Sequence, residues 1–373
     1  MKKYLPEALF LIGGWVIATT GFSFIILTML RYYQEAALAS DLTSEHSIAW
    51  YMTSDYQLFE GLLFGFGFGL VHFLTHWYTE RGNIQRLSFG RVILIKSLLY
   101  LLGLGVVAVV VFSVITSMSY FPKNAINELL ENEMPRMMIL AGTLFILFFL
   151  IFFNFLLEIN KKFGPKNLLR IFSGRYHTPI VEERIFMFID LKSSTYYAEQ
   201  LGHFKYSQLI QLCFRHLNSV LESSNGEVYQ YVGDEAVVTW DARYQKNFLY
   251  CIDFFFAFQG KIEAERSTYE SRFGLVPEFK AGVNCGSVTA AEVGTLKREI
   301  AYHGDVINTA ARIQEQCNIL KEKLLVSGDF LSELGNGHTY HSIPLGATEL
   351  KGKYQPVKIF AIKAQPEKEE VMA

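Results

Sequence analysis

The segment Gly226–Trp240, GEVYQYVGDEAVVTW, predicts two short strands joined by a tight turn. Val, Tyr and Trp dominate both halves of this segment, and β-branched and aromatic residues favour strands. The bend itself, Gly233-Asp234-Glu235, contains a glycine and two carboxylates. Gly and Asp are common turn residues, so Asp234 has two interpretations here: an ordinary solvated turn residue, or one ligand of a metal site.

Further strands and helices are expected on both sides of this hairpin. The apolar run Ile185–Ile189 (IFMFI) is typical of a buried strand, and it ends at Asp190. Asn284-Cys285-Gly286 is expected to be a turn between two strands. The other expected elements are strands at Phe279–Val283, Ser287–Val293 and Glu299–His303, and helices at about Tyr196–Glu222, Asn247–Glu265, Asp305–Asn318 and Phe330–Leu334. Strands interleaved with helices in this way predict an α+β sandwich around a single sheet.

The N-terminal part differs in composition, because it contains long runs without Asp, Glu, Lys or Arg. A helix of about 20 apolar residues crosses a bilayer. Four runs are long enough: Ala8–Leu30, Gly61–Thr79, Ser97–Thr116 and Met137–Leu157. A cleaved signal peptide is not expected, because the first run is long and no small-residue cleavage site follows it. The sequence therefore predicts a four-helix transmembrane domain.

Charges beside the four runs predict their orientation. Basic residues precede the first run, separate the second from the third and follow the fourth: Lys2, Lys3, Arg81, Arg86, Arg91, Lys96, Lys161, Lys162, Lys166 and Arg170. The other two connections are acidic, with Glu35, Asp41, Glu45, Asp55, Glu128, Glu131 and Glu133. Because basic connections stay in the cytoplasm, we expect a multi-pass protein of the cell (inner) membrane with both termini cytoplasmic.

These patterns divide the chain into four parts. We expect a transmembrane domain at 1–157, a cytosolic linker at 158–181, a soluble domain at 182–363 and a disordered tail at 364–373. The formal net charge of -2 argues against a general nucleic-acid-binding protein. The 4 cysteines match no zinc pattern, so we expect them to be small buried hydrophobic residues.

Asp190 and Asp234 are candidates for a pair of metal ligands. If their strands pair in antiparallel fashion, the two carboxylates can face each other and hold divalent ions that clamp a triphosphate. Ser193, Ser194 and Thr195 follow Asp190 and lead into an expected helix. Free backbone N–H groups at a helix N-terminus receive phosphate oxygens. An unrelated buried strand that ends in Asp is the alternative.

Two later segments add polar side chains. Asn308 and Arg312 are four residues apart and so share one face of the expected helix. An amide and a guanidinium there can steady a ribose and a developing phosphate charge. The alternative is an ordinary amphipathic helix with a solvated Arg312. Lys351 and Lys353 lie between two late strands, where a solvated turn is also a possible interpretation.

In this order, the four segments resemble the motifs of the class III nucleotidyl cyclases. They are FIDLKSST (Phe188–Thr195), YVGDEAV (Tyr231–Val237), GDVINTAAR (Gly304–Arg312) and LKGK (Leu350–Lys353). The resemblance covers about residues 185–362. It implies a ferredoxin-like α+β cyclase catalytic domain at 182–363. It also implies an enzyme that converts ATP into 3′,5′-cyclic AMP and pyrophosphate.

The resemblance also implies roles for single residues. Asp190 and Asp234 match the aspartates that bind two Mg²⁺ or Mn²⁺ and activate the ribose 3′-hydroxyl. Asn308 and Arg312 match the pair that orients the ribose and stabilises the transition state, supplied from the partner chain of a homodimer. Lys351 matches the lysine that binds the triphosphate. With all five positions present, a competent enzyme is expected, whose partners are ATP or GTP, a second copy of the chain and the lipid bilayer.

The positions that recognise the base depart from the family pattern. Adenylate-forming members usually carry Lys at the position of Gln230 and Asp or Thr at that of Ala301, whereas guanylate-forming members often carry Glu and a small residue. Gln has both donors and an acceptor, so it can read either purine edge, and Ala301 offers only packing. The resemblance implies ATP as the substrate, because cyclic AMP production is the commoner activity of bacterial-type members of the family, with GTP and cyclic GMP as the alternative. A non-catalytic nucleotide-binding module is a second alternative. Diguanylate synthesis is not expected, because Val232 and not a second glycine precedes Gly233. Lys353 can share or replace the role of Lys351.

The second apolar run has two features of its own. His72 and His76 share one helix face, where they bind a metal or haem or simply pack against other helices. The same run contains Gly61, Gly65, Gly67 and Gly69. In an apolar span such glycines indicate close helix packing and not a phosphate loop.

Overall fold

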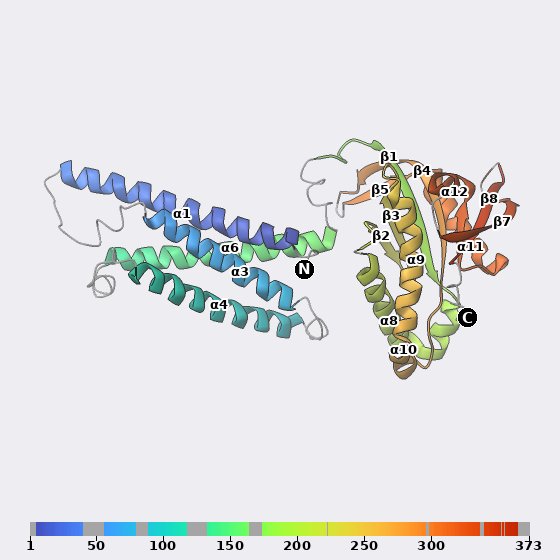
Figure 1. Ribbon diagram of the computed structural model, residues 1–373, viewed down its shortest axis with the longest axis horizontal. Coiled ribbons are helices and arrows are strands. Elements are labelled where there is room, and N and C mark those ends of the chain that lie inside the picture. Colours follow the sequence, from blue (N-terminus) through green and yellow to red (C-terminus); the bar gives the residue numbers. More distant parts are fainter. Residues whose placement is uncertain are drawn as a thin grey trace, which may run out of the picture. The chain divides into compact units, whose positions relative to one another are not determined.

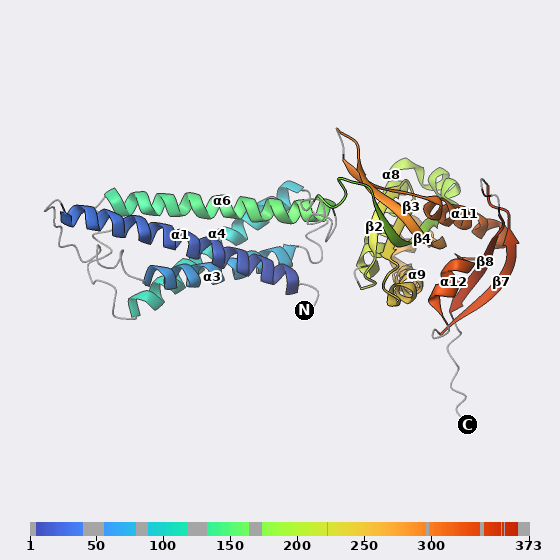
Figure 2. The same ribbon diagram turned by 90° about the horizontal axis from the view of Figure 1, so that it is seen from above.

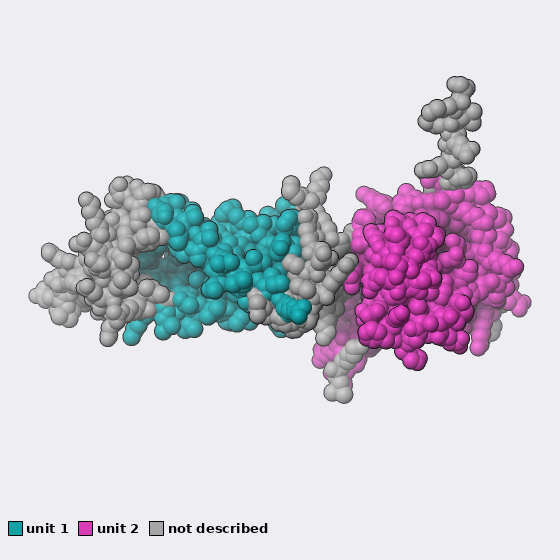
Figure 3. Space-filling view, turned by 90° about the horizontal axis from the view of Figure 1, so that it is seen from below, with its two compact units in different colours: residues 1–159 teal, residues 160–373 magenta. Residues whose placement is uncertain are grey.

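The computed structural model describes residues 5–39, 56–79, 89–117, 133–163, 174–221, 223–295, 298–335, 339–351, 353 and 355–364. The chain divides into two compact units, Met1–Ile159 and Asn160–Ala373, which Figure 3 colours separately. The described part of the first unit is helical, and every described strand belongs to the second.

The described residues of the first unit form four helices, which run side by side in Figures 1 and 2. They are α1 (Leu5–Ala39), α3 (Tyr56–Thr79), α4 (Phe89–Ser117) and α6 (Glu133–Phe163). Three contain stretches long and apolar enough to cross a membrane, at Leu5–Tyr32, Gln57–Thr79 and Leu140–Leu157, whereas α4 has a shorter apolar stretch at Ile95–Val111. The four expected helices are therefore present, while their crossing of a membrane and their orientation in it stay predictions.

The glycines of α3 allow close packing against α1, as expected. A Cβ atom on Gly65 would lie 2.3 Å from the Thr19 Oγ1 atom, and one on Gly69 would lie 2.6 Å from the Ile12 Cα atom. Thr19 also donates its hydroxyl hydrogen to the Gly61 carbonyl at 2.7 Å. A larger side chain on this face of α3 would force the two helices apart.

His72 lies where all four helices of the first unit meet. Trp15 on α1 donates its indole N–H to the His72 Nδ1 atom at 3.0 Å. The Tyr100 ring of α4 lies 5.1 Å from the His72 ring, and the Tyr100 hydroxyl donates to Asn154 on α6. Among the described residues, no group of three or more His, Cys, Asp or Glu is arranged to hold a metal. The structure thus shows His72 packed among the helices, and a metal or haem at His72 and His76 stays a prediction.

The second unit is built on one sheet. Its strands are β1 (Ile180–Leu191), β2 (Glu227–Val232), β3 (Glu235–Asp241), β4 (Phe279–Val293), β5 (Glu299–His303), β6 (Leu324–Ser327), β7 (Tyr340–Thr348) and β8 (Val357–Ala364). Their order is β2-β3-β1-β4-β6-β8-β7, with β5 paired to β4. The β4–β6 pair is parallel and the other pairs are antiparallel. The helices are α8 (Ser194–Leu221), α9 (Lys246–Ala264), α10 (Arg266–Phe273), α11 (Asp305–Leu320) and α12 (Gly328–Leu334).

Strand β1 is the centre of this unit, because apolar side chains cover both of its faces. Ile185, Met187 and Ile189 belong to the large core that includes residues of α8, α9 and α12. Phe186 and Phe188 point to the other face and pack with residues of α11. Burial on both faces explains why the run IFMFI is apolar without alternation.

Several boundaries differ from those expected. The turn expected at Asn284-Cys285-Gly286 is wrong, because β4 continues through it and pairs with β1 along its whole length. The helix expected at 196–222 is interrupted at Gly202 (φ 70, ψ 160). The expected linker at 158–181 is shorter, since α6 continues to Phe163 and β1 begins at Ile180. Ala364 ends β8, and the rest of the expected tail lies outside the described residues.

Candidate active site

The pairing of β1 with β3 brings Asp190 and Asp234 to the same end of the sheet. The two strands are antiparallel, and Asp190 lies opposite Glu235, the first residue of β3. Asp234 precedes Glu235 in the turn after β2. Gly233 has a φ of 63 at this turn, a conformation that favours glycine. The antiparallel arrangement expected from the sequence is thus present.

Two side chains of other elements contact Asp190. Lys280 on β4 places its Nζ atom 3.2 Å from Asp190 Oδ2. Gln314 on α11 donates its Nε2 hydrogen to the same oxygen at 3.1 Å. Burial raises the pKa of the Asp190 carboxyl above its ordinary value, and the nearby Asp234 carboxyl adds to this rise, while Lys280 opposes it. Lys280 and Gln314 therefore hold the Asp190 side chain in place. Because the pKa of its carboxyl is still raised, a further positive charge beside it would favour the ionised form.

Asp234 lacks such partners. Its Oδ2 atom is buried and has no hydrogen-bond partner among the described residues. A buried carboxylate oxygen without a partner is costly, and a cation would satisfy it. Mg²⁺ takes one or two protein carboxylates together with waters and phosphate oxygens. The pair Asp190 and Asp234 therefore fits divalent ions whose coordination a phosphate substrate completes, since the described residues contain no larger cluster of metal-ligating side chains.

Glu235 differs from the sequence interpretation, which gave this residue a place in the turn and no role. It begins β3, is half-buried and lies opposite Asp190. Burial, Asp190 and Asp234 raise the pKa of its carboxyl to about 7. The sequence interpretation also missed Lys280 and Gln314. Lys280 lies opposite Asp190 in β4, a relation that only the strand register reveals.

The N-terminus of α8 lies close to the two aspartates. Ser193 has a φ of 59, and α8 begins at Ser194. After the break at Gly202, Tyr206 returns to form a hydrogen bond with Ser194. Burial, followed by the Asp234 charge, raises the pKa of Tyr206 to about 12. The structure thus brings Ser194, and with it the start of α8, to the aspartates.

Helix α11 lies against the sheet at Gly282. A Cβ atom on Gly282 would come within 2.2 Å of the Gln314 backbone nitrogen, so only glycine allows this approach. Arg312 precedes Gln314 by two residues, which is about 200° around a helix. Gln314 points to Asp190, so Arg312 and Asn308 lie on another side of the helix, where Arg312 contacts Glu315 at 3.0 Å. Within one chain, the structure does not bring Asn308 and Arg312 to the aspartates.

The two candidate lysines differ in their contacts. Lys353 forms an ion pair with Asp305, the first residue of α11. Lys351 is exposed in the turn that precedes it. The structure therefore gives Lys353 a partner at the start of α11 and leaves the Lys351 side chain facing solvent.

The two base-recognition candidates lie on different strands that touch through their neighbours. Gln230 is exposed on β2, directly after an irregularity in the pairing with β3 at Tyr229. Ala301 lies on β5 opposite Ala291. The rings of Tyr229 and Tyr302, the neighbours of these two residues, have centroids 5.1 Å apart. An aromatic contact therefore joins the two strands next to the candidate positions.

Comparisons with known proteins agree with this geometry. Residues 179–364 match the model of the adenylate and guanylate cyclase catalytic domain. Adenylate cyclase 2 of Rhizobium meliloti (strain 1021) is 33% identical over 210 residues, which cover 56% of this chain and 58% of that protein. The chain thus matches less than two thirds of that relative.

Solved structures resemble the chain as well. A bacterial light-regulated adenylyl cyclase has a TM-score of 0.51 and 18% identity, covering 63% of this chain and 67% of its own. The adenylyl cyclase CyaB from P. aeruginosa has a TM-score of 0.46 and 18% identity, covering 51% of this chain and 98% of its own. At 18% identity the likeness to the light-regulated enzyme concerns the fold alone. The match of residues 179–364, with the 33% identity to an adenylate cyclase, shows that this part of the chain is a catalytic domain of the class III adenylate and guanylate cyclase family.

Proposed function

We propose that this protein is an integral-membrane cyclase that converts ATP into 3′,5′-cyclic AMP and pyrophosphate. The observation that carries the proposal is the pair Asp190 and Asp234, with one buried Asp234 oxygen that has no partner among the described residues. The name of the relative that is 33% identical, an adenylate cyclase, supports ATP as the substrate. GTP is the alternative, because Gln230 offers both donors and an acceptor to a purine.

The chemistry follows from the residues in this arrangement. Asp190 and Asp234 would hold two Mg²⁺ or Mn²⁺, which when bound lower the pKa of the ribose 3′-hydroxyl and neutralise triphosphate charge. The 3′-hydroxyl loses its proton to solvent and its oxygen forms a bond to the α-phosphorus. The bond from that phosphorus to the oxygen bridging to the β-phosphate breaks, and pyrophosphate leaves. Backbone N–H groups at Ser193, Ser194 and Thr195 are suited to receive phosphate oxygens at the start of α8.

The remaining polar residues act on the same substrate from a second chain. Asn308 and Arg312 lie on a side of α11 away from the Asp190 of their own chain, which favours a site completed by a homodimer. There Arg312 would stabilise the charge that develops on the α-phosphate. Lys351, exposed next to the ion-paired Lys353, is suited to bind the triphosphate.

The helices of the first unit suggest the location of the enzyme. Three of them have the length and composition of membrane spans. We infer four spans with both termini in the cytoplasm, where ATP is available to the domain at 179–364. A reporter enzyme that works only in the cytoplasm should therefore be active when it is fused to either terminus.

The function is tested with the purified full-length chain, Mn²⁺ and either ATP or GTP. We expect cyclic AMP as the main product and its loss on chelation of the metal. Cyclic GMP as the main product would move the substrate to the alternative. Binding of ATP without turnover across metals and pH would support a non-catalytic module instead.

A further inference from the structure

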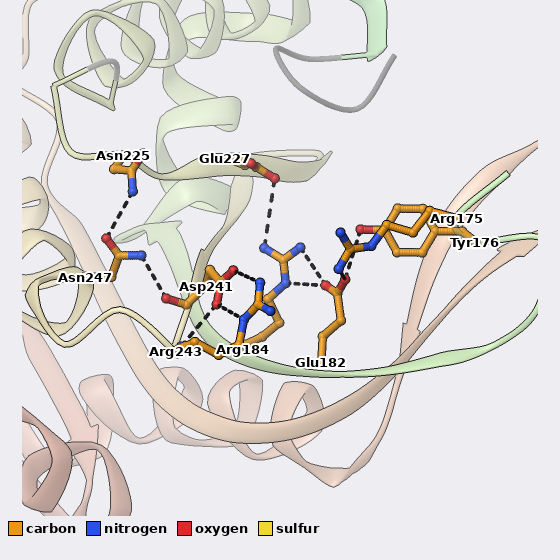
Figure 4. Close-up of polar contacts among 9 residues, drawn as sticks. All are labelled: Arg175, Tyr176, Glu182, Arg184, Asn225, Glu227, Asp241, Arg243 and Asn247. Atoms are coloured by element: carbon orange, nitrogen blue, oxygen red, sulfur yellow. Dashed lines mark hydrogen bonds and ion pairs between the residues drawn. The ribbon is translucent and has the colours of Figure 1, made fainter. Parts of the chain in front are cut away.

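Arg184 is the most completely surrounded charged side chain of the β1 strand. It is only 2% exposed. Its Nε atom donates to Glu182 Oε2 at 2.9 Å, its Nη2 atom lies 2.8 Å from the same oxygen, and its Nη1 atom lies 4.0 Å from Glu227 Oε2. Figure 4 shows the guanidinium between the two carboxylates. A buried arginine needs such partners, because burying an unpaired charge is strongly unfavourable.

Arg184 also contacts an aromatic ring on β5. Its Cζ atom lies 5.3 Å from the centroid of the Tyr302 ring. This distance is within the range of a cation–π interaction, which is stronger when the pair is removed from water. The Tyr302 ring in turn packs against Phe186 and Tyr229 at centroid distances of 5.3 and 5.1 Å. Arg184 therefore supports the cluster of rings that joins β5 to β2.

The contacts of Arg184 reach the strands that carry both base-recognition candidates, at Tyr302 on β5 and Glu227 on β2. Tyr302 directly follows Ala301 in β5. Glu227 lies in β2 three residues before Gln230. A movement of the guanidinium would therefore shift the backbone of both strands at the same time.

Glu182 holds the guanidinium in its orientation. Its Oε2 atom binds Arg184, and its Oε1 atom accepts hydrogen bonds from Arg175 Nη2 and Tyr176 Oη, both at 3.2 Å. Tyr176 is itself fixed, because its carbonyl accepts the Glu292 backbone N–H at 2.9 Å. In Figure 4 these residues approach Glu182 from the side opposite Arg184. Both Glu182 oxygens are thus used, which leaves the guanidinium little freedom to rotate.

We propose that Arg184, oriented by Glu182, is a positioning residue that sets the spacing between Gln230 on β2 and Ala301 on β5. Through this spacing Arg184 influences which purine the enzyme selects. This inference rests on the proposed function, since it assigns base recognition to those two residues. Arg184 lies six residues before Asp190 on β1. Its influence should therefore concern which base binds, and not the metal-dependent step.

The test compares ATP and GTP on the full-length chain. Arg184→Lys keeps the charge but loses the planar fork of the guanidinium, and Tyr302→Leu removes the ring that receives it. Each variant should change the ratio of kcat/KM for ATP to that for GTP by about three- to tenfold, mainly through KM. Tyr302→Phe keeps the ring and should retain the wild-type ratio. Arg243→Gln is the matched control, because Arg243 pairs with Asp241 nearby but is exposed and does not contact Tyr302.

A purely structural role gives a different result. A destabilised protein has fewer active molecules, so the rates with ATP and GTP fall by the same factor and the KM values stay constant. An unchanged ratio in both Arg184→Lys and Tyr302→Leu, or an equal shift in Arg243→Gln, would overturn the inference. Equilibrium binding of fluorescent ATP and GTP analogues gives the same ratio without turnover. A wild-type chain that neither binds nor converts the nucleotides would overturn the proposed function and the inference with it.

Discussion

Two ends of strand β1 present charged side chains on the same face of the sheet, but the two ends are built differently. At one end the buried Arg184 guanidinium lies among Glu182, Glu227 and the Tyr302 ring. At the other end β1 reaches Asp190, and the adjacent turn between β2 and β3 carries Asp234, which has a buried oxygen without a hydrogen-bond partner among the described residues. A satisfied buried charge holds strands in place, whereas an unsatisfied one is completed by a ligand. The Arg184 end therefore has the features of a region that positions the strands, and the end with Asp190 and Asp234 has those of a region that binds a ligand.

Removal of the Asp234 carboxylate should have the strongest effect on activity. Asp234→Ala should lower cyclic nucleotide formation by about 10²–10³-fold, the loss typical of removing one group that stabilises transition-state charge. The same change should raise the thermal midpoint of the metal-free chain, because it removes repulsion with Asp190 and Glu235. Product formation and thermal unfolding of the full chain measure both effects. Asp329→Ala, at an exposed position of α12, is the control and should change neither. Full activity of Asp234→Ala would remove the metal assignment.

Gly282 on β4 lies opposite Phe188, between the two ends of β1. Gly282→Ala should destabilise the domain by about 1–3 kcal/mol, because its Cβ atom would collide with the α11 backbone at Gln314. Displacing α11 should also lower activity, since α11 carries Asn308 and Arg312. Gly260→Ala in α9 is the matched control, because its Cβ atom would meet nothing within 4 Å. Urea unfolding of the two variants measures the difference, and equal midpoints would contradict the described packing.

The sequence allowed more of the reactive end to be predicted than of the positioning end. Asp190 and Asp234 were expected to meet, since a strand that ends in Asp and a Gly-Asp turn are local patterns. Lys280 was not foreseen as a partner of Asp190, because it becomes one only through the β1–β4 register. Arg184 was likewise missed, since in the sequence it is one of several charges before an apolar strand. Its burial follows from β2 and β5, which are distant in the chain.

Lys351 and Lys353 should affect the kinetics in different ways. Lys351→Ala should raise KM for the nucleotide by about tenfold, because a triphosphate loses one charge-assisted contact. Lys353→Ala should instead release Asp305 and act through the position of α11. In that case Asp305→Lys combined with Lys353→Asp should restore activity lost in either single variant. Steady-state kinetics of the five variants distinguish the roles, and an unchanged KM in Lys351→Ala would assign the phosphate contact elsewhere.

Titration of Glu235, next to Asp234, should make the stability of the domain depend weakly on pH. The pKa of Glu235 is raised from 4.5 to about 7, so the folded chain binds its proton more tightly than the unfolded chain does. Stability of the metal-free protein should therefore fall as the pH rises from 4.5 to about 7, and this contribution should level off above. In Glu235→Gln the decline should be smaller. Thermal midpoints measured across this range in the presence of a chelator test the sign, and a steeper decline in the variant would contradict it.

In the proposed homodimer, each active site combines the aspartates of one chain with α11 of the other. Asp234→Ala and Arg312→Ala should each be inactive alone, but co-expression of the two full-length variants should restore cyclic nucleotide formation. If chains pair at random, half of the dimers carry one intact site of two, so roughly a quarter of wild-type activity is expected. Activity no higher than that of the single variants, with both chains present in the purified dimer, would contradict the account.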